Sequence, residues 1–316
     1  MGLLGEIKPV KKPILGVSLY PEQESMEEIE NYLTMASRYG FTKIFTSMFS
    51  VPGTKEEVFD YFKNFCDLAH KHGMKVSGDC NTAFFKKMGA SESDISIFKE
   101  MGIDIIRMDL PYFDQRDVTL INNPYNITIE LSSCMIQAVR MALENGANPK
   151  NFSTCHNFYP ERYTASDLES IREVNKELSN LGIPSAVFIS SNEENTHGPW
   201  PVHDGLPTIE DHRWIPAELQ VRHWIAVGDV DEIIFGNAFA SEEEFKAIDQ
   251  VMKEAYVNIP KLVGQDYLAE LLPHGDVERV PFRVVLDDDV TDLEKEILFD
   301  NVYHQCGETP YYMIRS

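Results

Sequence analysis

The chain has 316 residues, of which 43% are hydrophobic and 25% are charged, and this composition excludes disordered and collagen-like proteins. Its 28 Lys and Arg residues stand against 51 Asp and Glu residues, which gives a net charge of −23. A surface this anionic repels phosphate backbones and acidic lipids, so we expect no nucleic-acid or membrane partner. A small anionic ligand remains compatible with a locally positive pocket.

The N-terminal residues and the cysteines both favour a cytoplasmic protein. The first residues lack a charged start followed by an apolar stretch, so they do not resemble a secretory signal. No apolar run reaches the roughly 18 residues of a transmembrane helix. Five cysteines are scattered without a CxxC pair, which is not the pattern of a disulfide framework.

Strand-like and helix-like segments alternate along the first 256 residues. Short apolar runs predict strands at residues 14–20, 42–46, 75–78, 103–108, 128–131, 152–155, 185–190 and 232–235. Several are nearly continuous in hydrophobicity, which is typical of parallel strands buried on both faces. Amphipathic stretches predict helices at residues 26–38, 56–72, 134–144, 165–181 and 241–256.

Glycines and a capping motif mark the ends of these helices. Ser241 precedes three glutamates and predicts a capping box at the last helix. Glycines that suit a left-handed helix end lie just before the next strand, at Gly40, Gly73, Gly102, Gly146, Gly182 and Gly228. Eight strand–helix units in about 255 residues match an α/β protein with a (β/α)₈ TIM barrel. A doubly wound open sheet is the alternative. Its dinucleotide-binding form is disfavoured, because no GxGxxG follows the first strand.

The pattern changes after residue 258. Short β-like runs lie between residues 263 and 290, separated by Pro260, Pro273, Gly275 and Pro281. We therefore expect a barrel domain over residues 1–258 and a small β-rich domain over residues 259–316. The last six residues read like the middle of a strand, so we expect this second domain to be incomplete in the chain.

Three acidic residues end consecutive predicted strands. Asp79, Asp109 and Glu130 should project toward one mouth, because barrel enzymes place their chemistry at the carboxyl ends of the strands. Crowded carboxylates push one pKa up and leave another group ionised, which suits an acid paired with a base or nucleophile. This is the arrangement of glycosidases. The alternative for each acid alone is a cap on the next helix.

Further polar residues accompany these acids. Arg107 lies two residues before Asp109 on the same strand face, where it is expected to pair with Asp109 or to bind substrate. His156, Asn157 and Tyr159 follow the sixth strand and are expected to contact substrate, although a lone His is more often a structural hydrogen-bonding residue. A metal site that combines His156 with the acids is the alternative. No HxxH or HExxH spacing occurs, so we expect no metal and no other cofactor.

A long loop at residues 190–214 follows the seventh predicted strand. Loops of this length in a compact barrel are usually functional, and barrels often bind phosphate near strands seven and eight. The alternative is an ordinary lid, or a helix that starts at Thr208. The candidates for binding phosphate or carboxylate groups are Ser190, His197, Arg213 and Asn237.

Several segments together resemble the MupG-type 6-phospho-N-acetylmuramidases, in order from about residue 13 to residue 316. They are residues 16–22, 129–132, 155–164, 205–213 and 236–241, with HNFYP at 156–160 and GLPT at 205–208 the most specific. The resemblance implies a (β/α)₈ barrel followed by a small cyclophilin-like domain. It also implies a cytoplasmic glycosidase, without a metal, that cleaves N-acetylmuramic acid 6-phosphate from N-acetylglucosamine during cell-wall recycling.

Three positions depart from that family. Leu110 stands where a second acid is frequent, Ser132 where Asn is frequent, and Asn237 where Asp is frequent. These positions face the pocket of the predicted barrel, so they bear on the substrate more than on the type of reaction.

The sequence therefore predicts hydrolysis of a phosphorylated amino-sugar glycoside. Asp109 and Glu130 are the favoured catalytic pair, and Asp79 is the third candidate. Glu22 joins His156 and its neighbours as a contact for the sugar hydroxyls or the acetamido group. Two alternatives stay open: a metal-dependent sugar-phosphate isomerase or epimerase on the same barrel, and a non-catalytic sugar-phosphate binding protein. A homo-oligomer is also open.

Overall fold

Eight parallel strands close into a barrel within residues 12–20, 23–49, 51–199 and 204–255, which the computed structural model describes. Each strand pairs with the next, and the last pairs with the first. This confirms the predicted (β/α)₈ barrel over an open sheet. The strands are β1 (Ile14–Leu19), β2 (Phe41–Ser47), β3 (Lys75–Cys80), β4 (Ile105–Met108), β5 (Thr128–Ser132), β6 (Phe152–Cys155), β7 (Ser185–Ile189) and β8 (Glu232–Phe235).

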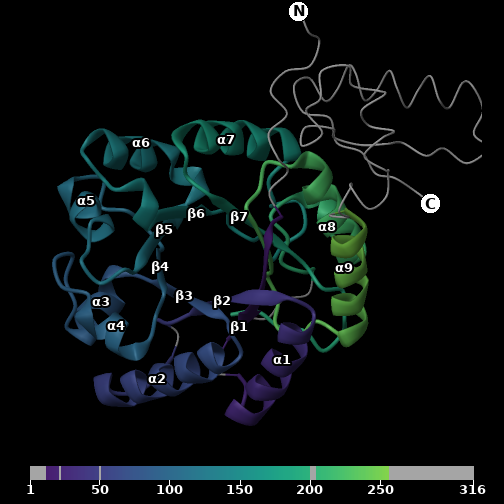
Figure 1. Cartoon of the computed structure of the whole chain (residues 1–316), viewed down its shortest axis with the longest axis horizontal. Coiled ribbons are helices and arrows are strands. Elements are labelled where there is room, and N and C mark those ends of the chain that lie inside the picture. The colour runs from purple at the N-terminus through teal and green to yellow at the C-terminus, as the bar shows by residue number, and fades with distance from the viewer. Residues whose placement is uncertain (1–11, 21–22, 50, 200–203, 256–316) are drawn as a thin grey trace, which may run out of the picture.

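The helices form a ring outside the barrel (Figure 1). They are α1 (Met26–Arg38), α2 (Lys55–Lys71), α3 (Thr82–Met88), α4 (Ser96–Met101), α5 (Gln115–Ile121), α6 (Ile136–Glu144), α7 (Leu168–Leu181), α8 (Ala217–Val227) and α9 (Glu242–Ala255). The predicted amphipathic stretches match α1, α2, α6, α7 and α9. The sequence analysis gave no bounds for α3, α4, α5 and α8, although it placed a helix end at Gly228. In α3, α4 and α5, six or seven residues are too few to show a helical period.

The local signals at the helix ends behave as predicted. The Ser241 backbone N–H donates to Glu244 Oε2 at 3.0 Å, and the Glu244 N–H donates to Ser241 Oγ at 3.2 Å, which completes the capping box. All six glycines predicted at helix ends have φ between 72° and 92°. Thr208 does not start a long helix, because a single 3₁₀ turn (Glu210–His212) follows it and α8 begins only at Ala217.

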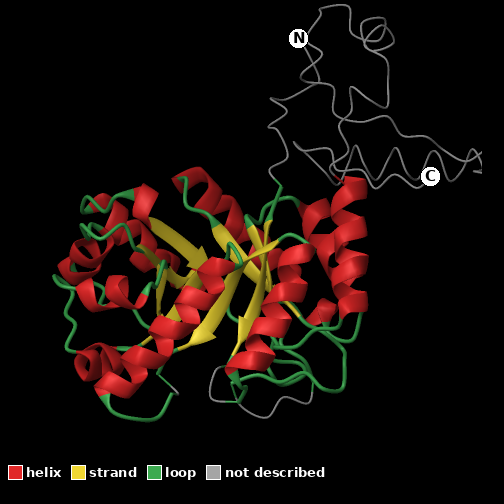
Figure 2. Ribbon diagram, turned by 60° about the horizontal axis from the view of Figure 1, so that its bottom comes forward, coloured by secondary structure: helices red, strands yellow, loops and turns green. Residues whose placement is uncertain are grey.

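The helices cover the outer face of the strands (Figure 2), and aromatic and aliphatic side chains fill the layer between them. Phe245 of α9 illustrates this packing, because its ring meets the edge of Phe41 from β2 at 4.6 Å and of Phe235 from β8 at 5.7 Å. Burial of this layer holds each helix against its strands and so fixes the strand ends that carry the polar residues.

The strand register sets how deep each candidate acid lies. β3 runs to Cys80, two residues past the predicted end, so Asp79 belongs to the strand. Asp79 pairs in register with Arg107, and Arg107 pairs with Glu130. Asp109 follows the end of β4, two residues beyond Arg107. Glu130 therefore sits one pleat deeper than Asp109, because side chains on one face repeat every two residues.

Some predictions fall on residues outside the described ranges. The second domain predicted at residues 259–316 lies there, as do its boundary and Glu22. Among the residues that are described, no helix has both the length and the apolar character needed to cross a membrane.

Candidate active site

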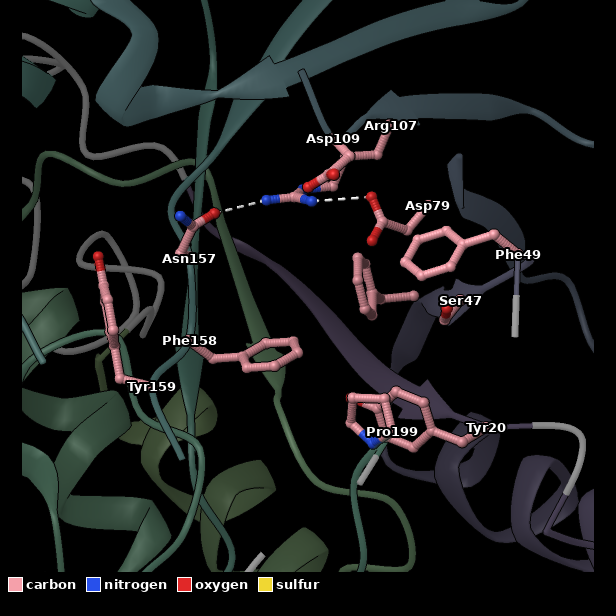
Figure 3. A pocket seen from close by; sticks show the side chains of 11 residues that line it. Tyr20, Ser47, Phe49, Asp79, Arg107, Asp109, Asn157, Phe158, Tyr159 and Pro199 are labelled. Carbon is pink, nitrogen blue, oxygen red and sulfur yellow. Dashed lines mark hydrogen bonds and ion pairs between the residues drawn. The ribbon is translucent and has the colours of Figure 1, made fainter. Parts of the chain in front are cut away.

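A cavity of about 290 Å³ opens among the carboxyl ends of the strands (Figure 3). Its wall combines two carboxylates, one guanidinium, one amide and several aromatic rings. The lining residues are Tyr20, Phe45, Ser47, Phe49, Asp79, Arg107, Asp109, Asn157, Phe158, Tyr159 and Pro199. Five of the predicted site residues thus meet in one place: Asp79, Arg107, Asp109, Asn157 and Tyr159.

Arg107 joins two of these polar groups. Its Nη1 donates to Asp79 Oδ1 at 2.8 Å, and its Nη2 donates to Asn157 Oδ1 at 2.6 Å. The arginine is only 6% exposed, and its guanidinium lies 5.9 Å from the centre of the Phe45 ring. Arg107 therefore pairs with Asp79 on the neighbouring strand, whereas the sequence suggested a pair with Asp109.

The two carboxylates of the cavity lie in different environments. Asp79 is buried, and this burial raises the pKa of its carboxyl, while the Arg107 guanidinium opposes the rise. Its second oxygen points away from Arg107 (Figure 3). Asp109 is exposed to solvent at the rim. Two carboxyl groups in one cavity whose environments differ, one buried with a raised pKa and one exposed to solvent, form the electrostatic pattern of an acid and a base.

Aromatic side chains form the apolar wall of the cavity, and the sequence reasoning did not select them. Phe158 meets Phe45 edge to face at 6.0 Å, and both rings pack on Phe188. Phe49 is 43% exposed at the rim. The only signal for them in the sequence is position, since Phe158 lies between Asn157 and Tyr159, and Phe49 follows the end of β2.

Glu130 occupies a different place from the one expected. It is fully buried inside the barrel, where its Oε2 accepts a hydrogen bond from Lys43 Nζ at 2.9 Å. Ser77 and Ser153 donate to its two oxygens at 3.3 and 3.4 Å. Lys43 also pairs with Glu232. Glu130 is therefore absent from the cavity lining and belongs to a charged network below it.

His156 also points away from the cavity. Its Nε2 lies 2.8 Å from Oδ1 of Asn175 on α7, and the ring is buried. Burial lowers the pKa of His156 to about 4, so the ring is neutral at physiological pH. His156 and Asn157 are neighbours at the end of β6, and only Asn157 turns toward the cavity.

We expect a His156→Gln variant to resist acid better than the wild type. The folded pKa of about 4 lies below the ordinary 6.5, so the neutral ring contributes stability above pH 6.5 that is lost as the pH falls toward 4. This loss amounts to about 3 kcal/mol. Glutamine does not titrate and retains an amide donor for Asn175. Urea unfolding at pH 7, 5.5 and 4 measures the difference, and parallel pH profiles of the two proteins would contradict the assignment.

The candidates near β7 and β8 hold the loops together. Ser190 Oγ accepts from the Leu206 N–H at 3.0 Å, and Asn237 Oδ1 accepts from the Ser191 N–H at 2.8 Å. Asn237 Nδ2 donates to Thr196 Oγ1 at 2.7 Å. These groups connect the β7 loop with the end of β8, and none of them lines the cavity.

His197 and Arg213 likewise make protein contacts. His197 pairs with Glu24 in the loop after β1 and stacks on Phe239 at 5.6 Å. Arg213 is buried, donates to both oxygens of Glu210 at 2.7 and 2.8 Å, and reaches the Tyr159 carbonyl at 3.1 Å. His197 thereby anchors the loop that brings Pro199 to the cavity.

The two most specific sequence segments contact each other. Thr208 Oγ1 donates to the Asn157 carbonyl at 3.0 Å, and the Tyr159 N–H donates to the Pro207 carbonyl at 3.2 Å. The GLPT segment thus supports the backbone that presents Asn157 and Tyr159. Within the described ranges, no group of three or more His, Cys, Asp or Glu residues is arranged to hold a metal ion.

Comparisons with known proteins identify a family. The sequence profile described as 6-phospho-N-acetylmuramidase, N-terminal (MupG_N) matches residues 15–250. An uncharacterised B. cereus protein of known structure is 32% identical, with a TM-score of 0.68 and coverage of 90% of this chain and 71% of that chain. A conserved protein of unknown function from Enterococcus faecalis is 22% identical, with a TM-score of 0.66 and coverage of 76% and 65%.

More distant structures share the barrel alone. A GH138 enzyme targeting pectin rhamnogalacturonan II is 13% identical, with a TM-score of 0.51, and the match covers 80% of this chain and 40% of that chain. No curated protein matches the sequence.

Proposed function

The chain belongs to the MupG_N family, and on that premise we propose that it hydrolyses the bond between N-acetylmuramic acid 6-phosphate and N-acetylglucosamine. The family carries the name of a glycosidase, and membership supports a glycosidase-type function. The reaction would serve the recycling of phosphorylated cell-wall fragments in the cytoplasm. It would need no metal, because carboxylates supply the acid and the base.

The observation that carries this proposal is the pair of carboxylates in one cavity. Asp79 and Asp109 reach it from β3 and from the end of β4, and aromatic rings line much of the rest of its wall. Glycosidases use two carboxyl groups that flank the scissile bond, one to protonate the leaving oxygen and one as base or nucleophile. We assign the acid to Asp79, since burial raises its pKa, and the second role to Asp109.

This assignment replaces Glu130 of the sequence-based pair with Asp79. Glu130 is 0% exposed and is hydrogen-bonded to Lys43, so a substrate in the cavity does not reach it. Arg107 is the one cation among the described lining residues, and its donors hold Asp79 and Asn157.

The direct test is to incubate the protein with N-acetylmuramic acid 6-phosphate linked β to N-acetylglucosamine, and with the unphosphorylated disaccharide. Mass spectrometry follows the products, with and without a chelator. We expect cleavage of the phosphorylated disaccharide alone, unaffected by the chelator. Failure to cleave either disaccharide would refute the proposal, and loss of activity on chelation would favour the metal-dependent alternative.

A further inference from the structure

The amide of Asn157 has a fixed orientation. Its Oδ1 accepts two hydrogen bonds, from Arg107 Nη2 at 2.6 Å and from Ser132 Oγ at 3.3 Å. A guanidinium can only donate, so the atom that faces Arg107 must be the amide oxygen. The Nδ2 group with its two hydrogens therefore points the other way. No side chain or carbonyl among the described residues accepts a hydrogen bond from it.

The groups that hold this amide are rigid. Arg107 is buried and is held by Asp79, and the Asn157 carbonyl accepts from Thr208 Oγ1 at 3.0 Å. Ser132 is 3% exposed at the end of β5. Asn157 itself lines the cavity and lies half-buried. The structure thus presents a preorganised hydrogen-bond donor to whatever occupies the cavity.

The surroundings of Nδ2 select the chemistry of its partner. Arg107, the one cation among the described lining residues, already donates to Asp79 and Asn157, so no unpaired positive charge lies beside Nδ2 to attract an anion, and a neutral acceptor suits this amide donor. Next to the amide, Phe158 and Phe45 meet edge to face and supply an apolar surface. A polar donor beside an apolar wall fits a group with a carbonyl oxygen and a methyl, which is the shape of an acetamide.

The position of Asn157 relative to the acid agrees with this. A single guanidinium connects Asn157 Oδ1 with Asp79 Oδ1. In a pyranoside the C2 substituent is attached to the carbon next to the anomeric centre, where the acid acts. We propose that Asn157 Nδ2 donates to the C2 acetamido carbonyl of the sugar that is cleaved, with its methyl against Phe45 and Phe158. This inference rests on the proposed glycosidase function and names the contact that makes the enzyme select 2-acetamido sugars.

The matched variant for this contact is Asn157→Asp. A carboxylate is isosteric with the amide and still accepts from Arg107 and Ser132, but it has no hydrogen to donate into the cavity. If Asn157 has only a structural role, the variant should therefore keep the substrate preference of the wild type. The substrates are the 4-nitrophenyl glycoside of N-acetylmuramic acid 6-phosphate and its counterpart with a hydroxyl at C2. The measured quantity is the ratio of their kcat/KM values.

We expect the wild type to prefer the acetamido substrate by at least about 10²-fold, because a site built to bond a polar group rejects analogues that lack it. In Asn157→Asp this preference should fall below about tenfold, mainly through loss of activity on the acetamido substrate. Phe49→Leu, at the rim of the same cavity, is the control and should change both substrates equally.

The outcomes separate the two proposals. A wild type that cleaves both aryl glycosides equally well, or an Asn157→Asp variant that keeps the preference, would overturn the acetamido contact while the glycosidase function stands. A wild type that cleaves neither glycoside and neither disaccharide would overturn the function and the contact with it.

Discussion

An Asp79→Asn variant should lose about 10²–10⁴-fold in kcat/KM on the phosphorylated disaccharide and less than tenfold on its 4-nitrophenyl counterpart. A sugar leaving group needs a proton from the acid, whereas nitrophenolate leaves without one. Asparagine keeps an oxygen for Arg107 Nη1, so the cavity should keep its shape. An Asp109→Asn variant should instead lose about 10²–10⁴-fold on both substrates, because water attack or the glycosyl intermediate still requires the second carboxylate.

The pH profile gives an independent check on the acid. Burial raises the pKa of Asp79, so the protonated form persists to higher pH than in an ordinary aspartate. Activity on the disaccharide should therefore fall as the pH rises through this raised pKa, and this fall should be absent with the 4-nitrophenyl substrate, whose leaving group needs no proton. If Asp79→Asn lost equally on both substrates and Asp109→Asn lost nothing, Asp79 would not be the acid and Asp109 would not be the base or nucleophile.

The barrel was predictable because its signals are local. Buried parallel strands are short apolar runs whatever their partners, and a left-handed helix end requires glycine at one position, as at Gly182 and Gly228. Four helices were given no bounds from the sequence, and three of them, α3, α4 and α5, are too short to show a period. The end of β3 was placed too early because Asp79 and Cys80 do not continue the apolar run.

The site was predictable only as a set of strand ends. Chain order indicated which loops meet, and five predicted residues do line the cavity. It did not indicate which neighbour turns inward: at the end of β6, His156 faces α7 while Asn157 faces the cavity. Nor did it reveal that Arg213 would pair with Glu210. Such pairings depend on contacts between loops, and the sequence of one segment does not show which other segment it will contact.

Glu130 acts on the cavity only indirectly, because its carboxylate lies in the barrel interior. Lys43 lies between Glu130 and Glu232 and is 2% exposed. Glu130 also pairs in register with Arg107, and its charge favours the protonated guanidinium. Glu232, Lys43 and Glu130 thus form a charged network below Arg107, and this network supports the arginine that holds Asp79 and Asn157.

A Lys43→Met variant should therefore be destabilised by about 3–5 kcal/mol, because it leaves Glu130 charged and buried without its cation. Urea unfolding at pH 7 measures this loss. A second change, Glu130→Gln in the same chain, should recover a large part of the lost stability, because it removes the unpaired buried carboxylate. Such a recovery would show that the loss comes from the broken ion pair and not from altered packing.

The single variant Glu130→Gln decides between support and catalysis. If Glu130 only supports Arg107, the variant should lose stability but keep kcat/KM on the 4-nitrophenyl substrate within about tenfold of the wild type. If Glu130 were the nucleophile or base, the variant would in addition lose about 10²–10⁴-fold in turnover on every substrate. Its full burial and its bond to Lys43 favour the first result, because a carboxylate that substrate does not reach acts on the reaction only through the residues above it.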